Sequence, residues 1–248
     1  MKNNKIWLGL LAMMLVFGMT VVSCSSDDDN DGPTGGNAGI PGTADGSLSI
    51  ANQRVWEFNN AGNLVHYYGT RPAVNHWGFG GTGSITNGIL TFNITPTDVA
   101  GASLQPLEVI FGWLIYDGGT ISVAGVQAGR FMSLNAGGSR LERASISVQE
   151  VSNGYNFTFE EVEFFYVDRD VIISHPGGRI TDEYNDSGFI YTYIHTISAF
   201  RVYLQQGWNA LHWHQTGTFR ETSPTTATYN TTWTLHVGNP ANLRWFID

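Results

Sequence analysis

A strand–turn–strand pattern is carried by the stretch Ser145-Ile146-Ser147-Val148-Gln149-Glu150-Val151-Ser152-Asn153-Gly154-Tyr155-Asn156-Phe157-Thr158-Phe159-Glu160. Polar and apolar residues alternate on both sides of Asn153-Gly154, a dipeptide that favours a tight hairpin because a type I′ turn needs positive φ at both central residues. A turn at these two residues places Val148 opposite Phe159. The stretch therefore predicts two antiparallel strands with one apolar and one polar face.

The same character extends over residues 47–248. Glycine, threonine and aromatic residues are frequent, and no segment keeps a helical apolar period for long. A short helix around Pro106–Phe111 is the one exception. We predict an all-β fold, an antiparallel β-sandwich or a barrel-like meander of hairpins, in one domain; a split near residues 100–120 is the alternative. The expected strands are Gln53–Phe58, Leu64–Tyr68, Gly88–Ile94, Thr120–Val126, Arg130–Leu134, Ala144–Val151, Tyr155–Val167, Val171–Ser174, Phe189–Leu204, Trp208–His214, Thr228–Val237 and Leu243–Ile247.

A second hairpin is predicted at Gln206-Gly207. Its turn would place Val202 opposite Leu211, and Phe200 opposite Trp213, so that these side chains share a core face. A slip by one residue would mix apolar and polar side chains on both faces.

This register predicts a polar face on the other side of the strands, because successive side chains alternate between the two faces. Aromatic rings beside hydrogen-bond donors suit sugars, whose C–H faces stack on rings while their hydroxyls bind polar groups. The alternative is a solvated sheet face made of good strand-forming residues. The predicted ligand-binding face consists of Tyr191, Tyr193, His195, Arg201, Tyr203, His212, His214 and His236.

Two histidines on one strand, His212 and His214, are also candidate metal ligands, with His195 or His236 as a third. No spacing fixes that third ligand, and the sequence has no His-Glu-x-x-His motif. We therefore predict no metal and no cofactor.

Acid–base chemistry has two candidate residues, Asp168 and Asp170, which flank Arg169 after an expected strand. Paired carboxylates serve glycosidases, but this arrangement also suits a salt-bridged turn. Glu161 and Glu163 alternate with apolar residues in the manner of a solvated face. No Gly-x-Ser-x-Gly nucleophile elbow is present. The sequence favours a non-catalytic protein and leaves a glycoside hydrolase-like enzyme as the alternative.

The N-terminus has the anatomy of a secretory signal. Lys2 and Lys5 precede an apolar run over residues 6–22, and the only cysteine, Cys24, follows at once. We predict a signal peptide over residues 1–23, a lipid on Cys24 and a flexible acidic tether over residues 24–46. The run is at the short limit for a bilayer-spanning helix, which needs about 20 residues; a permanent transmembrane anchor is the alternative.

The charge balance excludes one class of partner. Of the 12 basic residues, two are the leader lysines, so ten arginines face 21 acidic residues. Nucleic-acid binding needs a basic patch for phosphate contacts, and we predict none here. The membrane partner is expected to be reached through the lipid, because an acidic surface does not hold anionic lipids.

The leader and the run Ser25-Ser26-Asp27-Asp28-Asp29-Asn30-Asp31 resemble the lipobox and acid-rich tether of Bacteroidetes-type surface lipoproteins. Scattered parts of the body resemble them as well. The resemblance implies an outer-membrane protein, exposed at the cell surface, and carries no known activity. With the body of the chain, it predicts a protein that binds a glycan or a surface protein, or mediates adhesion; a structural envelope protein is a further alternative. The body motifs are residues 83–92, 165–171, 207–209 and 243–246.

Overall fold

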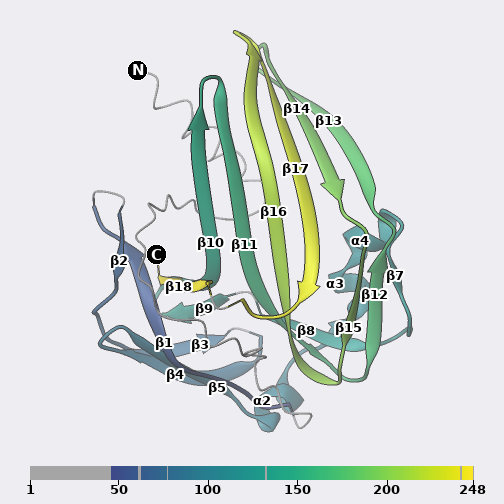
Figure 1. Cartoon of the computed structure of the whole chain (residues 1–248). Coiled ribbons are helices and arrows are strands. Elements are labelled where there is room, and N and C mark those ends of the chain that lie inside the picture. The colour runs from purple at the N-terminus through teal and green to yellow at the C-terminus, as the bar shows by residue number, and fades with distance from the viewer. Residues whose placement is uncertain (1–45, 61–62, 77, 132, 241, 248) are drawn as a thin grey trace.

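A computed structural model describes residues 46–248 except 61–62, 77, 132, 241 and 248 (Figure 1). Strands account for 68% of the structure and helices for 8%, which confirms the all-β class. The signal peptide, Cys24 and nearly all of the tether lie outside the described residues. Within the described part of the chain, no helix is long and apolar enough to cross a membrane.

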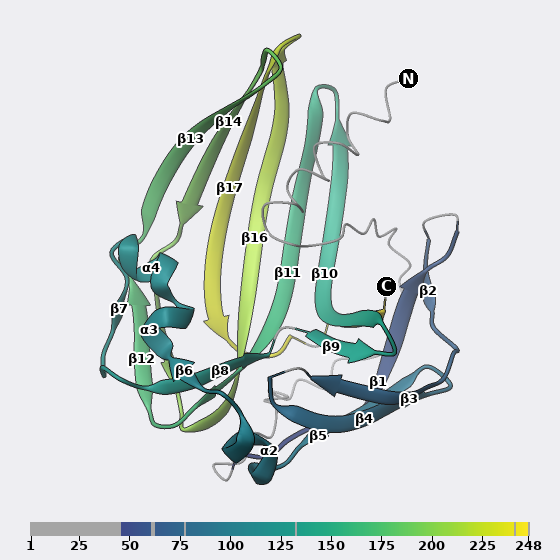
Figure 2. The same cartoon turned by 180° about the vertical axis from the view of Figure 1, so that it is seen from behind.

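Six long strands stand side by side in one curved sheet, here called the tall sheet (Figures 1 and 2). Their order across the sheet is β13-β14-β17-β16-β11-β10. The β14–β17 pair is parallel, whereas the other pairs are antiparallel, so the sheet is mixed rather than purely antiparallel. The bounds are β10 Ser139–Val151, β11 Gly154–Val167, β13 Gly178–Asp186, β14 Phe189–Ile197, β16 Gly207–Ser223 and β17 Thr226–Val237.

The lower half of β10 belongs to a second, barrel-like part. The pairing continues from β10 through β18, β1, β5, β4 and β3 to β9, and β9 pairs back with β10. This ring of strands encloses a core in which Phe92, Phe131 and Trp245 are fully buried. The other strands of the ring are β1 Leu48–Phe58, β3 Arg71–His76, β4 Gly80–Thr86, β5 Ile89–Ile94, β9 Ser133–Ala136 and β18 Arg244–Ile247. Outside the ring, β2 Leu64–His66 pairs with β1, and β8 Gln127–Phe131 pairs with β11 and with β6 Gln105–Pro106.

A three-stranded sheet and two short helices cover the lower end of one face of the tall sheet (Figure 2). Leu107, Phe111 and Leu114 of the helical segment share a second core with Leu211 and Leu235 of the tall sheet. The predicted helix around Pro106–Phe111 is confirmed by α3. The elements are β7 Thr120–Ile121, β12 Val171–His175, β15 Phe200–Leu204, α3 Leu107–Ile110 and α4 Gly112–Tyr116, with α2 Pro96–Gly101 farther away along the chain.

Strand β11 lies between both cores. Val162 and Phe164 point into the barrel-like part, and Phe165 points into the second core. Glu163 lies on the same side as Phe165 and is 1% exposed. This double burial explains why the run from Val162 to Phe165 is buried without interruption.

The first predicted hairpin is present with the predicted faces, but its register is wrong. The turn residues are Ser152 and Asn153, and Val148 lies opposite Phe157 instead of Phe159. Gly154 pairs within the sheet at φ 152°. A side chain there would meet the Phe219 carbonyl oxygen at 2.0 Å, so the glycine allows the close approach of β16 rather than the turn.

The second predicted hairpin is wrong in its pairing. β15 pairs with β12, with Val202 opposite Ile173, and not with β16. The predicted apolar side chains still meet in the second core. The Asn209 side chain explains the geometry: it accepts a hydrogen bond from the Gln205 amide and donates to the Gln205 and Gly207 carbonyls, which holds a turn between two different sheets.

The expected strand Phe189–Leu204 is also divided. It ends as β14 at Ile197 and resumes as β15 at Phe200. The Ser198 amide donates to the Trp233 carbonyl at the last step of the β14–β17 pairing, after which the chain leaves the tall sheet. The two halves therefore present their side chains to different surroundings.

Candidate functional site

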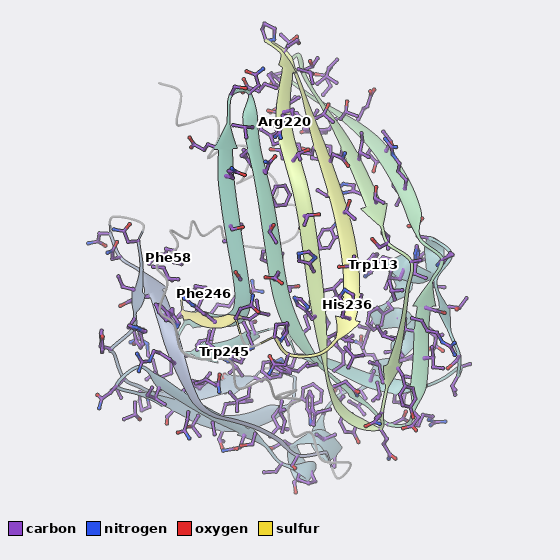
Figure 3. All side chains as sticks on the ribbon, viewed as in Figure 1. Phe58, Trp113, Arg220, His236, Trp245 and Phe246 are labelled. Atoms are coloured by element: carbon purple, nitrogen blue, oxygen red, sulfur yellow. The ribbon has the colours of Figure 1, made fainter. Side chains whose placement is uncertain are left out.

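The tall sheet has two chemically distinct faces. Its inner face bears Trp213 paired with Leu235, and its outer face bears His212 paired with His236. Figure 3 labels His236, which lies on β17, and Trp113, which lies on α4. Period two on each strand assigns the other side chains to one face or the other.

The inner face holds a cavity of about 560 Å³ between the tall sheet and the helices α3 and α4. Ligand pockets usually have volumes of roughly 300–1,000 Å³. Its aromatic lining consists of Phe111, Trp113, Phe165, Trp213 and Trp233. Its charged and titratable lining consists of Asp117, Arg130, Glu161, Glu163, Asp182 and His195.

Ring contacts fix the aromatic walls. Trp113 lies 5.8 Å from Trp213 between ring centroids, and Phe111 stacks on Phe165 at 5.1 Å. Trp113 is 50% exposed, so it stands at the rim, whereas Trp213 is 7% exposed. The Trp213 indole N–H has no hydrogen-bond partner among the described residues. A buried donor without a partner is costly, and this one belongs to a residue that lines the cavity.

Two carboxyl groups lie side by side on β11. Arg130 of β8 binds Glu163 through both nitrogens of its fork, with Nε donating to Oε2 at 2.7 Å. Glu161 has its side chain hydrogen-bonded to Glu163 instead. Burial, reinforced by the neighbouring charges of Glu163 and Glu142, holds the pKa of Glu161 well above its ordinary value. This environment therefore favours the protonated form of Glu161.

His195 lines the cavity from β14. Its Nδ1 lies 2.8 Å from the Thr231 hydroxyl on β17. Burial lowers the pKa of His195, and the opposite effect of Asp182 is smaller. The imidazole is thus neutral at neutral pH and presents hydrogen-bonding nitrogens rather than a charge.

Above the cavity the inner face is filled by stacked rings. Tyr193 stacks on Tyr229 at 5.1 Å with an interplanar angle of 6°, and the Tyr155 hydroxyl donates to that of Tyr229 at 3.4 Å. Burial raises the pKa of Tyr155 to about 12. Phe157 lies over Gly217, where a side chain would meet its ring at 2.3 Å. This packing closes the upper end of the site.

The outer face carries the predicted histidine cluster. The His212 ring lies 6.2 Å from that of His214 and 6.3 Å from that of His236. His212 Nε2 lies 3.2 Å from Glu160, which also accepts a hydrogen bond from Asn242. Burial lowers the pKa of His212 despite Glu160. Across the described ranges, no group of three or more His, Cys, Asp or Glu side chains is placed to hold a metal ion.

Arg201 and Tyr203 lie on β15 of the three-stranded sheet, away from both faces of the tall sheet. The Tyr203 hydroxyl donates to Asp170, which lowers the pKa of that carboxyl. The Arg169 guanidinium donates to Asp168 at 2.8 Å and lowers the pKa of Asp168. Both aspartates are thus engaged in the turn before β12, apart from the cavity.

The single polar face predicted from the sequence is not formed. Its eight members fall on three surfaces: Tyr191, Tyr193 and His195 on the inner face, the other three histidines on the outer face, and Arg201 with Tyr203 on β15. His195 therefore cannot join His212 and His214 around one ion.

Sequence reasoning missed the acidic wall of the cavity. Glu161 and Glu163 were expected on a solvated face, but they follow Phe157 and Phe159 at period two and so share the apolar face. This period-two alternation is the feature of the sequence from which the position of both glutamates could have been predicted. Arg130 and the tryptophans gave no such signal, because their approach depends on strands and helices that are distant in the sequence.

No family model matches this chain, and neither does any curated protein or any solved structure. What the site can do is therefore argued from its own residues.

Proposed function

We propose that this chain is a non-catalytic binding protein that takes a small ligand, of the size and kind of a glycan unit, into the inner-face cavity. We further propose that it is held by a lipid on Cys24 at the outer membrane and faces outward. The observation that carries the binding proposal is the cavity itself, with aromatic rings on its walls and charged groups gathered on β8 and β11.

The lining supports recognition of a ligand with both flat apolar and polar parts. Trp113, Trp213 and Trp233 offer ring faces, against which the C–H face of a sugar stacks. Arg130, Glu161 and His195 offer donors and acceptors. Pockets of this kind, mostly apolar with a few convergent polar groups, are typical ligand sites.

Binding is better supported than glycoside hydrolysis. Glycosidases keep their two carboxyl groups roughly 5–9.5 Å apart on either side of the scissile bond. Glu161 and Glu163 are hydrogen-bonded to each other, and Glu163 is held by Arg130. Such a pair leaves no room for a glycosidic bond between its members.

The binding test is calorimetric titration of a panel of mono- and disaccharides into the full chain reconstituted in lipid nanodiscs. We expect Trp113→Ala to weaken binding by about tenfold, since aromatic contacts of this kind contribute about 1 kcal/mol or more. His236→Ala, on the outer face, is the matched control and should bind as the unaltered chain does. Binding that is absent throughout, or that responds to His236→Ala instead, overturns the proposal.

The anchor has an independent test. Cys24→Ser removes the only thiol that can carry the lipid, and several acyl chains are needed for firm membrane attachment. We expect the variant to leave the detergent phase or to remain unprocessed. Unchanged partitioning together with normal processing would refute the lipoprotein proposal.

A further inference from the structure

We propose that the inner-face cavity selects ligands that carry a positively charged amine together with a hydrogen-bond acceptor, and that amino sugars are the ligand class. This inference rests on the proposed function, because it names the kind of small ligand that the cavity binds. It starts from three features of the cavity: an excess of acidic side chains, a carboxyl group without an ion-pair partner among the described residues, and an indole N–H without an acceptor there.

The first feature is an excess of acid. The cavity is lined by four carboxyl groups, those of Asp117, Glu161, Glu163 and Asp182, and by one guanidinium, that of Arg130. Arg130 donates to Glu163 through Nε and Nη2. Among the described lining residues four carboxyl groups thus face one guanidinium, and a cationic ligand would meet a favourable field.

The second feature is the position of Glu161 within that lining. It pairs across the sheet with Ala144 on one side and with Trp213 on the other, neither of which carries a charge. No ion pair to Glu161 exists among the described residues. Glu161 is partly buried, and a desolvated carboxyl group in this situation favours holding a proton or meeting a cation. The raised pKa of Glu161 agrees with the first state when the cavity has no ligand.

The third feature is a donor without an acceptor. Trp213 is 7% exposed, lines the cavity, and its indole N–H has no partner in the described part of the chain. A hydroxyl oxygen of a ligand would satisfy it. Trp213 faces Glu161 in the neighbouring strand, so an acceptor on the indole and an amine on the carboxylate belong to one small molecule.

The aromatic rings that line the cavity also suit a cationic ligand. Cations are attracted to the faces of tryptophan rings within about 6 Å, and Trp113, Trp213 and Trp233 all line the cavity. The Arg130 guanidinium already lies 6.0 Å from the Phe165 ring, which shows that this wall accommodates a cation. An amine with neighbouring hydroxyls thus finds a partner for each of its parts.

The test compares glucose, glucosamine and N-acetylglucosamine by calorimetric titration into the full chain in nanodiscs. Only glucosamine carries the charged amine, while the ring and most hydroxyls are common to all three. We expect glucosamine to bind about tenfold more tightly than the other two, the scale of one close charge pair. Glu161→Gln should remove that preference, whereas Glu160→Gln, one residue away on the outer face, should keep it.

Proton linkage gives a second readout. Binding of the amine requires Glu161 to release its proton, so the preference for glucosamine should grow as the pH rises from the ordinary carboxyl range toward the raised pKa of Glu161. The groups that face this carboxyl are Glu163, Glu142 and Arg130, with Asp182 and His195 across the cavity. The Glu161→Gln variant should lack the pH response.

The outcomes separate the two proposals. Equal binding of glucose and glucosamine, lost with Trp113→Ala, would overturn the amine preference and leave the binding function intact. A preference for glucosamine that survives Glu161→Gln would also overturn it, since the charge would then be recognised elsewhere. If none of the three sugars binds, the amino-sugar inference is rejected, and the wider panel decides the binding function by itself.

Discussion

Glu160 and Glu161 are neighbours on one strand, but their side chains lie on opposite faces of the tall sheet and have different surroundings. Glu160 points to the outer face, where Asn242 donates to one of its oxygens and His212 Nε2 lies 3.2 Å from the other. Glu161 points to the inner face, where its close neighbours are Glu163 and the cavity. The alternation of side chains along a strand creates this contrast. The carboxyl group of Glu160 therefore has a hydrogen-bond donor beside it, whereas that of Glu161 has another acid beside it and no ion pair among the described residues.

The largest test of this contrast is Arg130→Ala. It leaves Glu163, which is 1% exposed, without its cation, and breaking one partner of a buried pair costs about 3 kcal/mol or more. We expect the free energy of unfolding in urea to fall by that amount. The outer-face counterpart, Glu160→Ala, removes a partly buried contact with His212, whose pKa is lowered so that the pair is not a full ion pair, and should cost less than about 1 kcal/mol.

A double variant distinguishes lost charge pairing from lost packing. Arg130→Met with Glu163→Leu keeps apolar volume and removes both charges, and it should recover most of the stability. Equal losses for the inner-face and outer-face single variants would contradict the difference between the two faces.

The next effect concerns packing above the cavity. Gly217→Val would push a side chain into the Phe157 ring, which a first carbon atom already meets at 2.3 Å. Overpacking of this kind costs about 2 kcal/mol. Thr216→Val, the adjacent exposed position on the outer face, should change stability by less than about 0.5 kcal/mol in the same denaturation experiment. A tolerated valine at position 217 would show that the stacked rings are loosely held.

The parts of this fold that were predictable from the sequence are those set by local alternation. The apolar face around Phe157 and the core side of Val202 and Trp213 follow from period two, and the structure confirms both. The partner of each strand did not follow, since pairing joins residues distant in the chain. β15 pairs with β12, and β14 lies parallel to β17, because the chain leaves one sheet at Ser198 for another.

Four strands, β3, β4, β6 and β13, escaped prediction, and for β4 and β13 the reason is their composition. β13 is exposed almost throughout and has no apolar alternation, and β4 is rich in glycine. The candidate site was the least predictable part of the molecule, because it depends on strand pairings that the sequence does not give. Parity alone places Glu161 beside Phe157 and Phe159, but only the assembled sheet brings β8, α4 and β13 around it. A lining gathered from so many elements has no signature in any one of them.

A smaller effect, with the opposite sign, is expected for Glu161→Gln. The folded-state pKa of Glu161 is raised, so the folded chain holds more protons than the unfolded chain, and stability falls as the pH rises from the ordinary carboxyl range toward that raised pKa. Gln lacks this titration. We expect the variant to be more stable at pH 7 by about 1 kcal/mol and to lose this advantage near pH 4. Thermal unfolding at several pH values measures it.

The matched control is again on the outer face. Glu160→Gln keeps its size and its neighbours and should change stability at pH 7 by less than about 0.5 kcal/mol. If Glu161→Gln instead destabilises the chain at pH 7, the carboxylate is stabilised by something in the folded protein, and the idea of an unmatched inner-face acid is wrong.

The smallest effect belongs to the histidines of the outer face. The His212 ring lies 6.2 Å from the ring of His214 and 6.3 Å from that of His236. The described residues nevertheless offer no three-ligand geometry for a metal. Zinc should therefore leave the unfolding temperature unchanged, and His212→Ala should alter stability at pH 7 by less than about 0.5 kcal/mol.

The pH dependence of stability gives a second measurement. Because burial lowers the pKa of His212, the unfolded state takes up a proton on this histidine before the folded state does as the pH falls through about 6.5. The native histidine therefore costs stability below that pH, and the alanine variant gains stability relative to it. Stabilisation by zinc that disappears in His212→Ala would show that the outer face is itself a binding site. The two faces would then differ in the kind of ligand that each binds, and not in whether their polar side chains have partners within the protein.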